Sequence, residues 1–241
     1  MPTVIDMNAN IVKPVFEIVQ TGAGEFTHQI PEAFHSGFIR GEGEGAERTK
    51  SNLDAVSRKL TDLNLSRVKL DPNHSNVVAN GFREITSAIG ESRNVLTGEA
   101  KRLTEALTEK SNFKPDPAMK AMVAGTFQAM RPEERGAAVA KLIAEGDGPT
   151  LAILASVSGV YTGLGDEVKG TIADRVFRRA DAQMFGQLED VRFNLTRVET
   201  ASAAAVKANA AFSAPMHKVG MAQETHKSMI DQPKSGFGVN A

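Results

Sequence analysis

Apolar residues recur at alternating spacings of three and four along much of this chain, with polar residues between them. This spacing places the apolar side chains on one face of a helix and is typical of helices that pack against other helices. The first such stripe lies within residues 47–70. It consists of Leu53, Val56, Leu60 and Leu63.

A second stripe indicates a long helix that ends near Lys110. Asp71 and Pro72 supply a favoured N-cap residue followed by proline at the first helical position. The connection between the two helices is short, so we predict an antiparallel hairpin over residues 47–110. Glycines inside the second helix suggest a close neighbour or a bend. The stripe consists of Val78, Phe82, Ile85, Ile89, Ser92, Leu96, Glu99, Leu103 and Ala106, and the glycines are Gly81, Gly90 and Gly98.

Residues 116–164 predict a cluster of three short helices. Asp116-Pro117 repeats the cap-and-proline signal, Pro132 opens the second helix, and Pro149 opens the third. We expect the methionines of this cluster to fill its core; the alternative interpretation is that they form an adaptable binding surface. They are Met119, Met122 and Met130.

The stretch 148–165 contains no charged residue, which invites comparison with a membrane segment. Gly, Ser, Thr and Pro dilute its apolar content, and its apolar core is shorter than the roughly 20 residues that span a bilayer. A buried core helix is therefore the favoured interpretation.

Residues 165–212 predict one long helix or a pair of helices divided at Gly186. Beyond Val198 the polar and small residues of the stripe suggest looser packing. The stripe consists of Leu188, Val191, Leu195, Val198, Ser202, Ala205, Asn209 and Phe212.

The two ends of the chain lack helical periodicity. Residues 1–46 read as a flexible or extended arm, in which Ile11–Val19 is a candidate edge strand and Gly41–Gly45 a flexible hinge. Residues 213–241 read as an extended tail. The expected fold is all-α: a helical domain at 47–212 between an N-terminal arm and a C-terminal tail.

Composition narrows the function classes. The chain contains no cysteine, which excludes thiol redox chemistry, disulfides and a cysteine nucleophile. Its formal net charge is -1, so the chain does not have the long-range attraction for nucleic acid that most nucleic-acid binders have. Nucleic-acid contact is therefore not indicated. An export signal would place an apolar segment close to the N-terminus. The sequence has no such segment there, so we expect no export signal.

No motif dictates a chemistry. No two histidines have the three- or four-residue spacing of metal ligands on one helix face, and no Gly-x-Ser-x-Gly elbow occurs. Arginines from Arg175 to Arg197 could touch phosphates, but interleaved acidic residues favour a salt-bridged surface. We therefore predict no catalytic, cofactor-binding or metal-binding residue and no cofactor.

The apolar stripes are the candidate functional feature, because the same pattern serves helix packing within one chain or between chains. The candidate packing or interface residues are Leu53, Val56, Leu60, Leu63, Phe82, Ile85, Ile89, Leu96, Leu188, Val191, Leu195 and Val198.

The order of arm, helical hairpin, short helices and long Ala-rich helix resembles helical structural-module proteins of tailed bacteriophages. The likeness rests mainly on residues 132–212, including the Leu164-Gly-Asp-Glu167 turn into a long helix. It implies a non-enzymatic virion component made in the host cytoplasm, such as an internal core, ejection or connector subunit. Its expected partners are copies of itself and other structural proteins contacted by the terminal arms. The alternatives are a membrane-active ejection protein that uses residues 148–165, although membrane contact is not favoured, and an enzyme with an unrecognised site.

Overall fold

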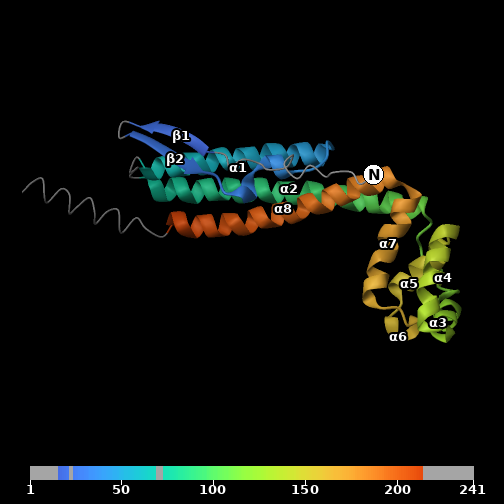
Figure 1. Cartoon of the computed structure of the whole chain (residues 1–241). Helices are drawn as coiled ribbons and strands as arrows, with labels where there is room; N and C mark the ends of the chain where they lie inside the picture. Colours follow the sequence, from blue (N-terminus) through green and yellow to red (C-terminus); the bar gives the residue numbers. More distant parts are fainter. Residues whose placement is uncertain (1–15, 22–23, 69–72, 214–241) are drawn as a thin grey trace, which may run out of the picture. The chain divides into compact units, whose positions relative to one another are not determined.

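A computed structural model describes residues 16–21, 24–68 and 73–213, and helices dominate this part of the chain (Figure 1). The expectation of an all-α fold with a helical hairpin, short helices and a long C-terminal helix is confirmed. The elements are β1 (Phe16–Thr21), β2 (Gly24–Gln29), the 3-10 helices η1 (Glu32–Phe34) and η2 (Ser36–Phe38), α1 (Glu44–Val68), α2 (His74–Lys110), α3 (Lys120–Ala129), α4 (Pro132–Glu145), α5 (Gly148–Ser156), α6 (Gly159–Thr162), α7 (Asp166–Ala180) and α8 (Ala182–Ser213).

The described residues form two compact units, and α1, α2 and α8 each contribute a segment to both. The first unit contains the described residues up to His35, together with Asn52–Ile89 and the part of α8 from Glu199 onward. The second contains Ser36–Ser51 and Gly90–Val198.

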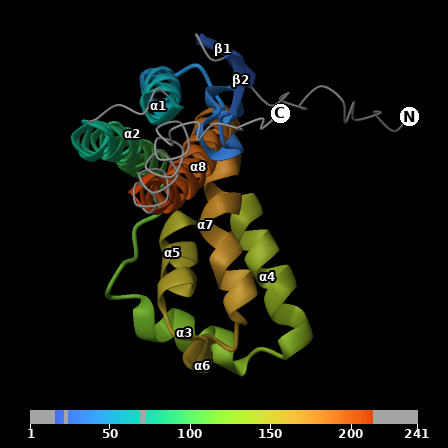
Figure 2. The ribbon, with the colours of Figure 1, turned by 90° about the vertical axis from the view of Figure 1, so that its left-hand side faces the viewer.

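In the first unit, α1 and α2 pack as an antiparallel pair, and α8 runs beside them (Figures 1 and 2). Asn52 donates to the carbonyl of Ala88 near one end of this segment, and Ser66 lies 2.7 Å from His74 near the other. Residues later in α1 therefore contact residues earlier in α2, which means that the two helices run antiparallel. Gly81 permits this approach, because a Cβ there would lie 2.8 Å from the side chain of Leu63.

The N-terminal segment departs from a simple extended arm. Strand β1 pairs with β2 of the same chain, with Phe16 opposite Gln29 and Thr21 opposite Gly24. The first residues of the predicted strand Ile11–Val19 lie outside the described residues. Farther along, Ile30 and Phe34 are buried, because their apolar side chains pack onto the helices. Ser57 of α1 donates to the carbonyl of Phe34 at 3.2 Å.

In the second unit, α3 to α7 form a compact cluster (Figure 2). Helix α5 packs against α3, α4 and α7, and α3 also packs against α6. As predicted, α4 begins at Pro132; it ends before Gly146, whose left-handed backbone caps the helix. Helix α3 begins at Lys120, after a turn in which Asp116 accepts from the N–H of Ala118.

The first part of the uncharged segment, helix α5, lies at the centre of this cluster, whereas α6 in its second part exposes Val160 and Tyr161. Four consecutive residues of α5, Leu151–Leu154, are buried, which confirms the core-helix interpretation. Gly148 lets α5 begin against the end of α2, because a Cβ there would lie 2.2 Å from the carbonyl oxygen of Ser111. In the described part of the chain, no helix is long and apolar enough to cross a membrane.

The break in the C-terminal helical region falls at Asp181, not at Gly186. Asp181 has extended backbone geometry, and its side chain accepts from the N–H of Met184 at 2.9 Å, as an N-cap does. The buried face of α8 departs from the predicted stripe on both sides of Val198, because Asn194 is buried whereas Leu195 is half-buried. Ala201 and Ala205 are buried, whereas the predicted stripe position Ser202 is exposed.

Candidate interaction surfaces

The predicted packing residues are, with one exception, buried within the chain. Leu195 is half-buried, and the other eleven are at most 6% exposed. They are Leu53, Val56, Leu60, Leu63, Phe82, Ile85, Ile89, Leu96, Leu188, Val191 and Val198. Their apolar surface is used in intramolecular packing, so it is not displayed to another chain.

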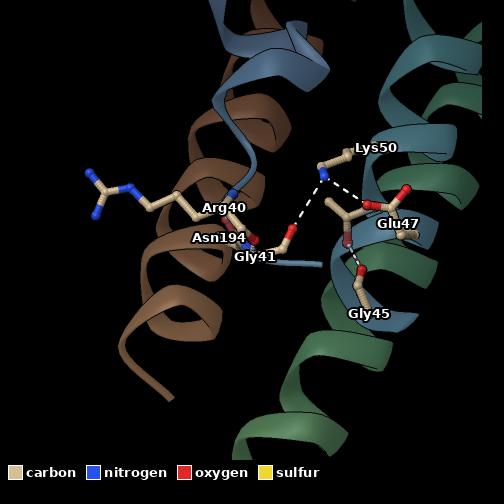
Figure 3. Close-up of polar contacts among 7 residues, drawn as sticks. Arg40, Gly41, Gly45, Glu47, Lys50 and Asn194 are labelled. Carbon is tan, nitrogen blue, oxygen red and sulfur yellow. Dashed lines mark hydrogen bonds and ion pairs between the residues drawn. The ribbon is translucent and has the colours of Figure 1, made fainter. Parts of the chain in front are cut away.

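Asn194 takes the inward position beside Leu195. Its side chain is fully buried, and both ends of its amide bind the backbone of Arg40 (Figure 3). The N–H of Arg40 donates to Asn194 Oδ1 at 2.8 Å, and Asn194 Nδ2 donates to the Arg40 carbonyl at 2.8 Å. The side chain thus pairs with the segment before α1 much as a strand edge would, satisfying a backbone donor and acceptor together.

Further polar contacts order the glycine-rich residues that follow Arg40. Lys50 donates to the Gly41 carbonyl at 3.2 Å and pairs with Glu47 at 2.7 Å (Figure 3). The buried Thr49 hydroxyl donates to the Gly45 carbonyl at 2.7 Å. Gly41 has φ +79°, which favours glycine. The expectation of a flexible hinge is therefore corrected: this segment leads directly into α1.

Two arginine–phenylalanine stacks connect the same segment to α8. The guanidinium carbon of Arg40 lies 3.6 Å from the ring centroid of Phe193. That of Arg197 lies 4.5 Å from the ring centroid of Phe38. Each element thus supplies one cation and one ring, and stacks of this kind contribute about 0.5–1 kcal/mol at exposed sites.

A charged groove of about 910 Å³ lies beside this segment in the second unit. Its walls come from residues 40–46, the middle of α2 and the first half of α8, with four carboxylates and two guanidinium groups: Glu42, Glu44, Glu99, Asp190, Arg40 and Arg102. Among the described lining residues none is Ser, Thr, Tyr, His, Lys or Cys. The groove therefore offers charge and hydrogen bonding but no nucleophile with a neighbouring base.

The acidic residues with altered titration have structural partners. The pKa of Asp181 is lowered mainly by a hydrogen bond from the Lys110 ammonium, at 2.7 Å, and also by the N–H of Met184. The pKa of Glu134 is lowered by hydrogen bonds from the Arg131 side chain and backbone at the start of α4. Both carboxylates are held charged at helix starts, where the helix dipole also favours negative charge.

Two of the arginines of α7 and α8 form the surface ion pairs expected from their interleaved charges. Arg178 pairs with Glu189 at 3.3 Å, and Arg192 pairs with Asp174 at 2.8 Å. Arg179 instead donates to the carbonyl of Ala144 at the end of α4. These guanidinium groups are engaged with acidic residues or backbone, so they form no free row of positive charge.

One arginine organises the α3–α6 corner of the second unit. The Arg135 guanidinium donates to the carbonyls of Phe127, Gln128 and Met130 at the end of α3. It also donates to Gly163, just after α6. Because the last carbonyls of a helix lack intrahelical donors, a single guanidinium satisfies the ends of two helices.

The same two helices present large apolar side chains to solvent. Met122 of α3 is 61% exposed, and Val160 and Tyr161 of α6 are 79% and 61% exposed. Val206 of α8 is the remaining large apolar residue of this kind in the described part of the chain. Met119 and Met130 are half-buried, so the expectation that these methionines fill the core is corrected for Met122. Three of the four exposed apolar side chains therefore share one pair of packed helices.

The histidines show no metal-binding arrangement in the part of the chain that the structure describes. His74 is buried at the start of α2 beside Ser66, and His35 is buried with its ring 3.0 Å from the Ile30 carbonyl. His217 and His226 lie outside the described residues. No group of three His, Cys, Asp or Glu side chains among the residues searched is placed to hold a metal ion.

Comparison with known proteins returned no match to a family model, to a curated protein or to a solved structure.

Sequence reasoning missed Asn194, Arg135 and the α3–α6 surface for different reasons. Asn194 lies one position before Leu195 of the apolar stripe, and an asparagine in this place indicates at most a polar interruption of that stripe. Arg135 follows the signal for a helix start and looks like any solvated arginine. The one available signal was the methionine content of residues 119–130, which pointed to a binding surface as the less favoured interpretation.

Proposed function

We propose that this chain is a non-enzymatic assembly protein, a structural component of a tailed-bacteriophage virion, and that its α3–α6 surface joins copies of the chain. One observation carries the proposal: Met122, Val160 and Tyr161 are exposed on two helices that pack together. Scattered apolar residues on a surface are ordinary, whereas a group on adjoining elements is typical of a protein–protein contact.

The packing of the long helices supports this assignment. Their apolar stripes are used within the chain, so assembly requires another surface. The α3–α6 corner is suited to that role, because the hydrogen bonds of Arg135 connect the two helices without covering their outer side chains. Several of the described ionisable groups serve as caps, ion pairs or backbone ligands, among them Asp181, Arg192 and Arg135, which supports a structural role over catalysis.

The test is the solution mass of the purified full-length chain, measured by light scattering after size exclusion. We expect a defined oligomer for the native sequence. Tyr161→Asp and Met122→Asp should each shift the mass toward the 25.7 kDa monomer, since a charge in an apolar contact is costly to desolvate. Both positions are exposed, so the helix content measured by circular dichroism should stay unchanged.

Val206→Asp is the matched control, because Val206 is 70% exposed but lies on α8 in the first unit. It should leave the mass of the oligomer unaltered. A native chain that stays monomeric at every concentration tested would contradict self-assembly. An equal loss of mass in all three variants would place the contact elsewhere than α3–α6.

A further inference from the structure

A second groove, of about 840 Å³, lies in the first unit between the start of α2 and the end of α8. Its apolar lining includes Val78, Phe82 and Phe212, and the rings of Phe82 and Phe212 stand 5.9 Å apart at a tilted angle. Polar side chains of both helices form the remainder of the lining, including Thr86 and Asn209. An apolar lining with a polar remainder is typical of a site that receives a peptide segment.

The chain itself continues from this groove. Ser213 lines it and is the last residue of α8. Residues 214–241 follow, and the nearest large apolar ones are Met216, Val219 and Met221. Pro215 disfavours continuation of α8, because it lacks an N–H and restricts the preceding residue. An extended chain advances by about 3.3 Å per residue, so Met216 can reach about 10 Å from Ser213.

We propose that this groove is the binding site for residues 216–221 of the same chain. Tethering makes this segment the favoured occupant, because a short connection gives it an effective concentration in the millimolar range or higher. Weak apolar contacts then suffice to fill the groove. Methionine suits an irregular groove, since its side chain is unbranched and adaptable.

The absence of cysteine from the sequence makes the proposal directly testable, because any introduced thiol is unique. Ala79 is exposed on α2 and lines the groove. In the full-length chain, Ala79→Cys should react slowly with a soluble maleimide. Adding Met216→Asp and Val219→Asp should speed that reaction by about fivefold or more, if the segment covers the groove in about four molecules of five.

Ala55→Cys is the matched control, since Ala55 is exposed on α1 of the same unit and lies outside the groove lining. Its labelling rate should be the same with and without the two aspartates. The proposal is overturned if the labelling rate of Ala79→Cys is unaffected by the aspartates, or if both thiols speed up together, which would mean a general loosening of the unit.

Dilution identifies the source of the segment. Protection by the chain's own residues 216–221 is independent of protein concentration. Protection that disappears on dilution would mean that a second copy supplies the segment, and this would overturn the intramolecular assignment. The labelling experiment does not involve α3–α6, so its failure and the failure of the proposed assembly surface are distinguishable.

Discussion

The buried amide of Asn194 and the backbone of Arg40 form a reciprocal pair of hydrogen bonds, each 2.8 Å long, across 154 positions of sequence. The side chain both accepts from the N–H and donates to the carbonyl of the same residue. Asparagine is well suited to this pairing, because its amide presents a donor and an acceptor side by side.

Replacing Asn194 with alanine should therefore lower the free energy of unfolding by about 2–3 kcal/mol, since two backbone groups lose partners in a partly buried place. Asn194→Asp should be at least as damaging, because a carboxylate keeps the acceptor but faces the Arg40 carbonyl with negative charge. Urea unfolding followed by circular dichroism measures the change. Gln187→Ala, at an exposed position of the same helix, is the control and should stay within about 0.5 kcal/mol of the native chain.

Asp181 predicts a pH dependence at the junction of α7 and α8. Its pKa is lowered in the folded chain, chiefly by Lys110, so the charged form stabilises the fold. That contribution is complete above the ordinary carboxyl pKa of about 4 and is lost as the pH falls through the lower folded-state value. Asp181→Asn keeps a capping acceptor but does not titrate.

We therefore expect Asp181→Asn to be less stable than the native chain at pH 7, with the difference shrinking as the pH is lowered below 4. Thermal melting across this range is the measurement. Asp62→Asn, at an exposed carboxyl of α1, serves as the comparison and should show a small difference at both ends. A native–variant difference for Asp181 that is constant with pH would contradict the role assigned to its charge.

Two glycines of the second unit should respond oppositely to alanine. A Cβ at Gly148 would meet the backbone carbonyl oxygens of Ser111 at 2.2 Å and Asn112 at 2.5 Å, and backbone cannot rotate aside. Gly148→Ala should cost about 3 kcal/mol or more. Apart from the adjoining backbone of its own helix, nothing lies within 4 Å of a Cβ placed at Gly136 in α4, so Gly136→Ala should stabilise by about 0.5–1 kcal/mol. Urea midpoints measured side by side would show the contrast, and midpoints that shift in the same direction would contradict it.

Elements defined by local chemistry were predictable from the sequence. Pro132 and Gly146 mark the two ends of α4, because a proline suits the first turn and a left-handed glycine ends a helix. The periodic stripes likewise gave the buried faces of α1 and α2. These signals act within a few residues of the feature that they determine.

Features that depend on distant partners were not predictable in the same way. The break at Asp181 combines a local cap with an ion pair to Lys110, whose position relative to Asp181 no periodicity reveals. Gly186 was the stronger local signal, yet a helix tolerates a glycine where packing compensates. Asn194 is buried ahead of Leu195 because the backbone of Arg40 supplies its partners, and the exposure of Met122 depends on how α3 meets α5 and α6.

Ile89 tests whether the apolar stripe of α2 packs within the chain or between chains. Its side chain is 5% exposed in the folded chain, so Ile89→Asp forces a carboxylate into the core of the bundle. The free energy of unfolding should fall by at least about 3 kcal/mol, from lost apolar burial and an unpaired charge. Arg93→Asp, one turn along at an exposed position, should leave the melting temperature close to native. A stripe used between chains would instead give a folded monomer with near-native melting for Ile89→Asp, so melting temperature and solution mass measured together separate the two arrangements.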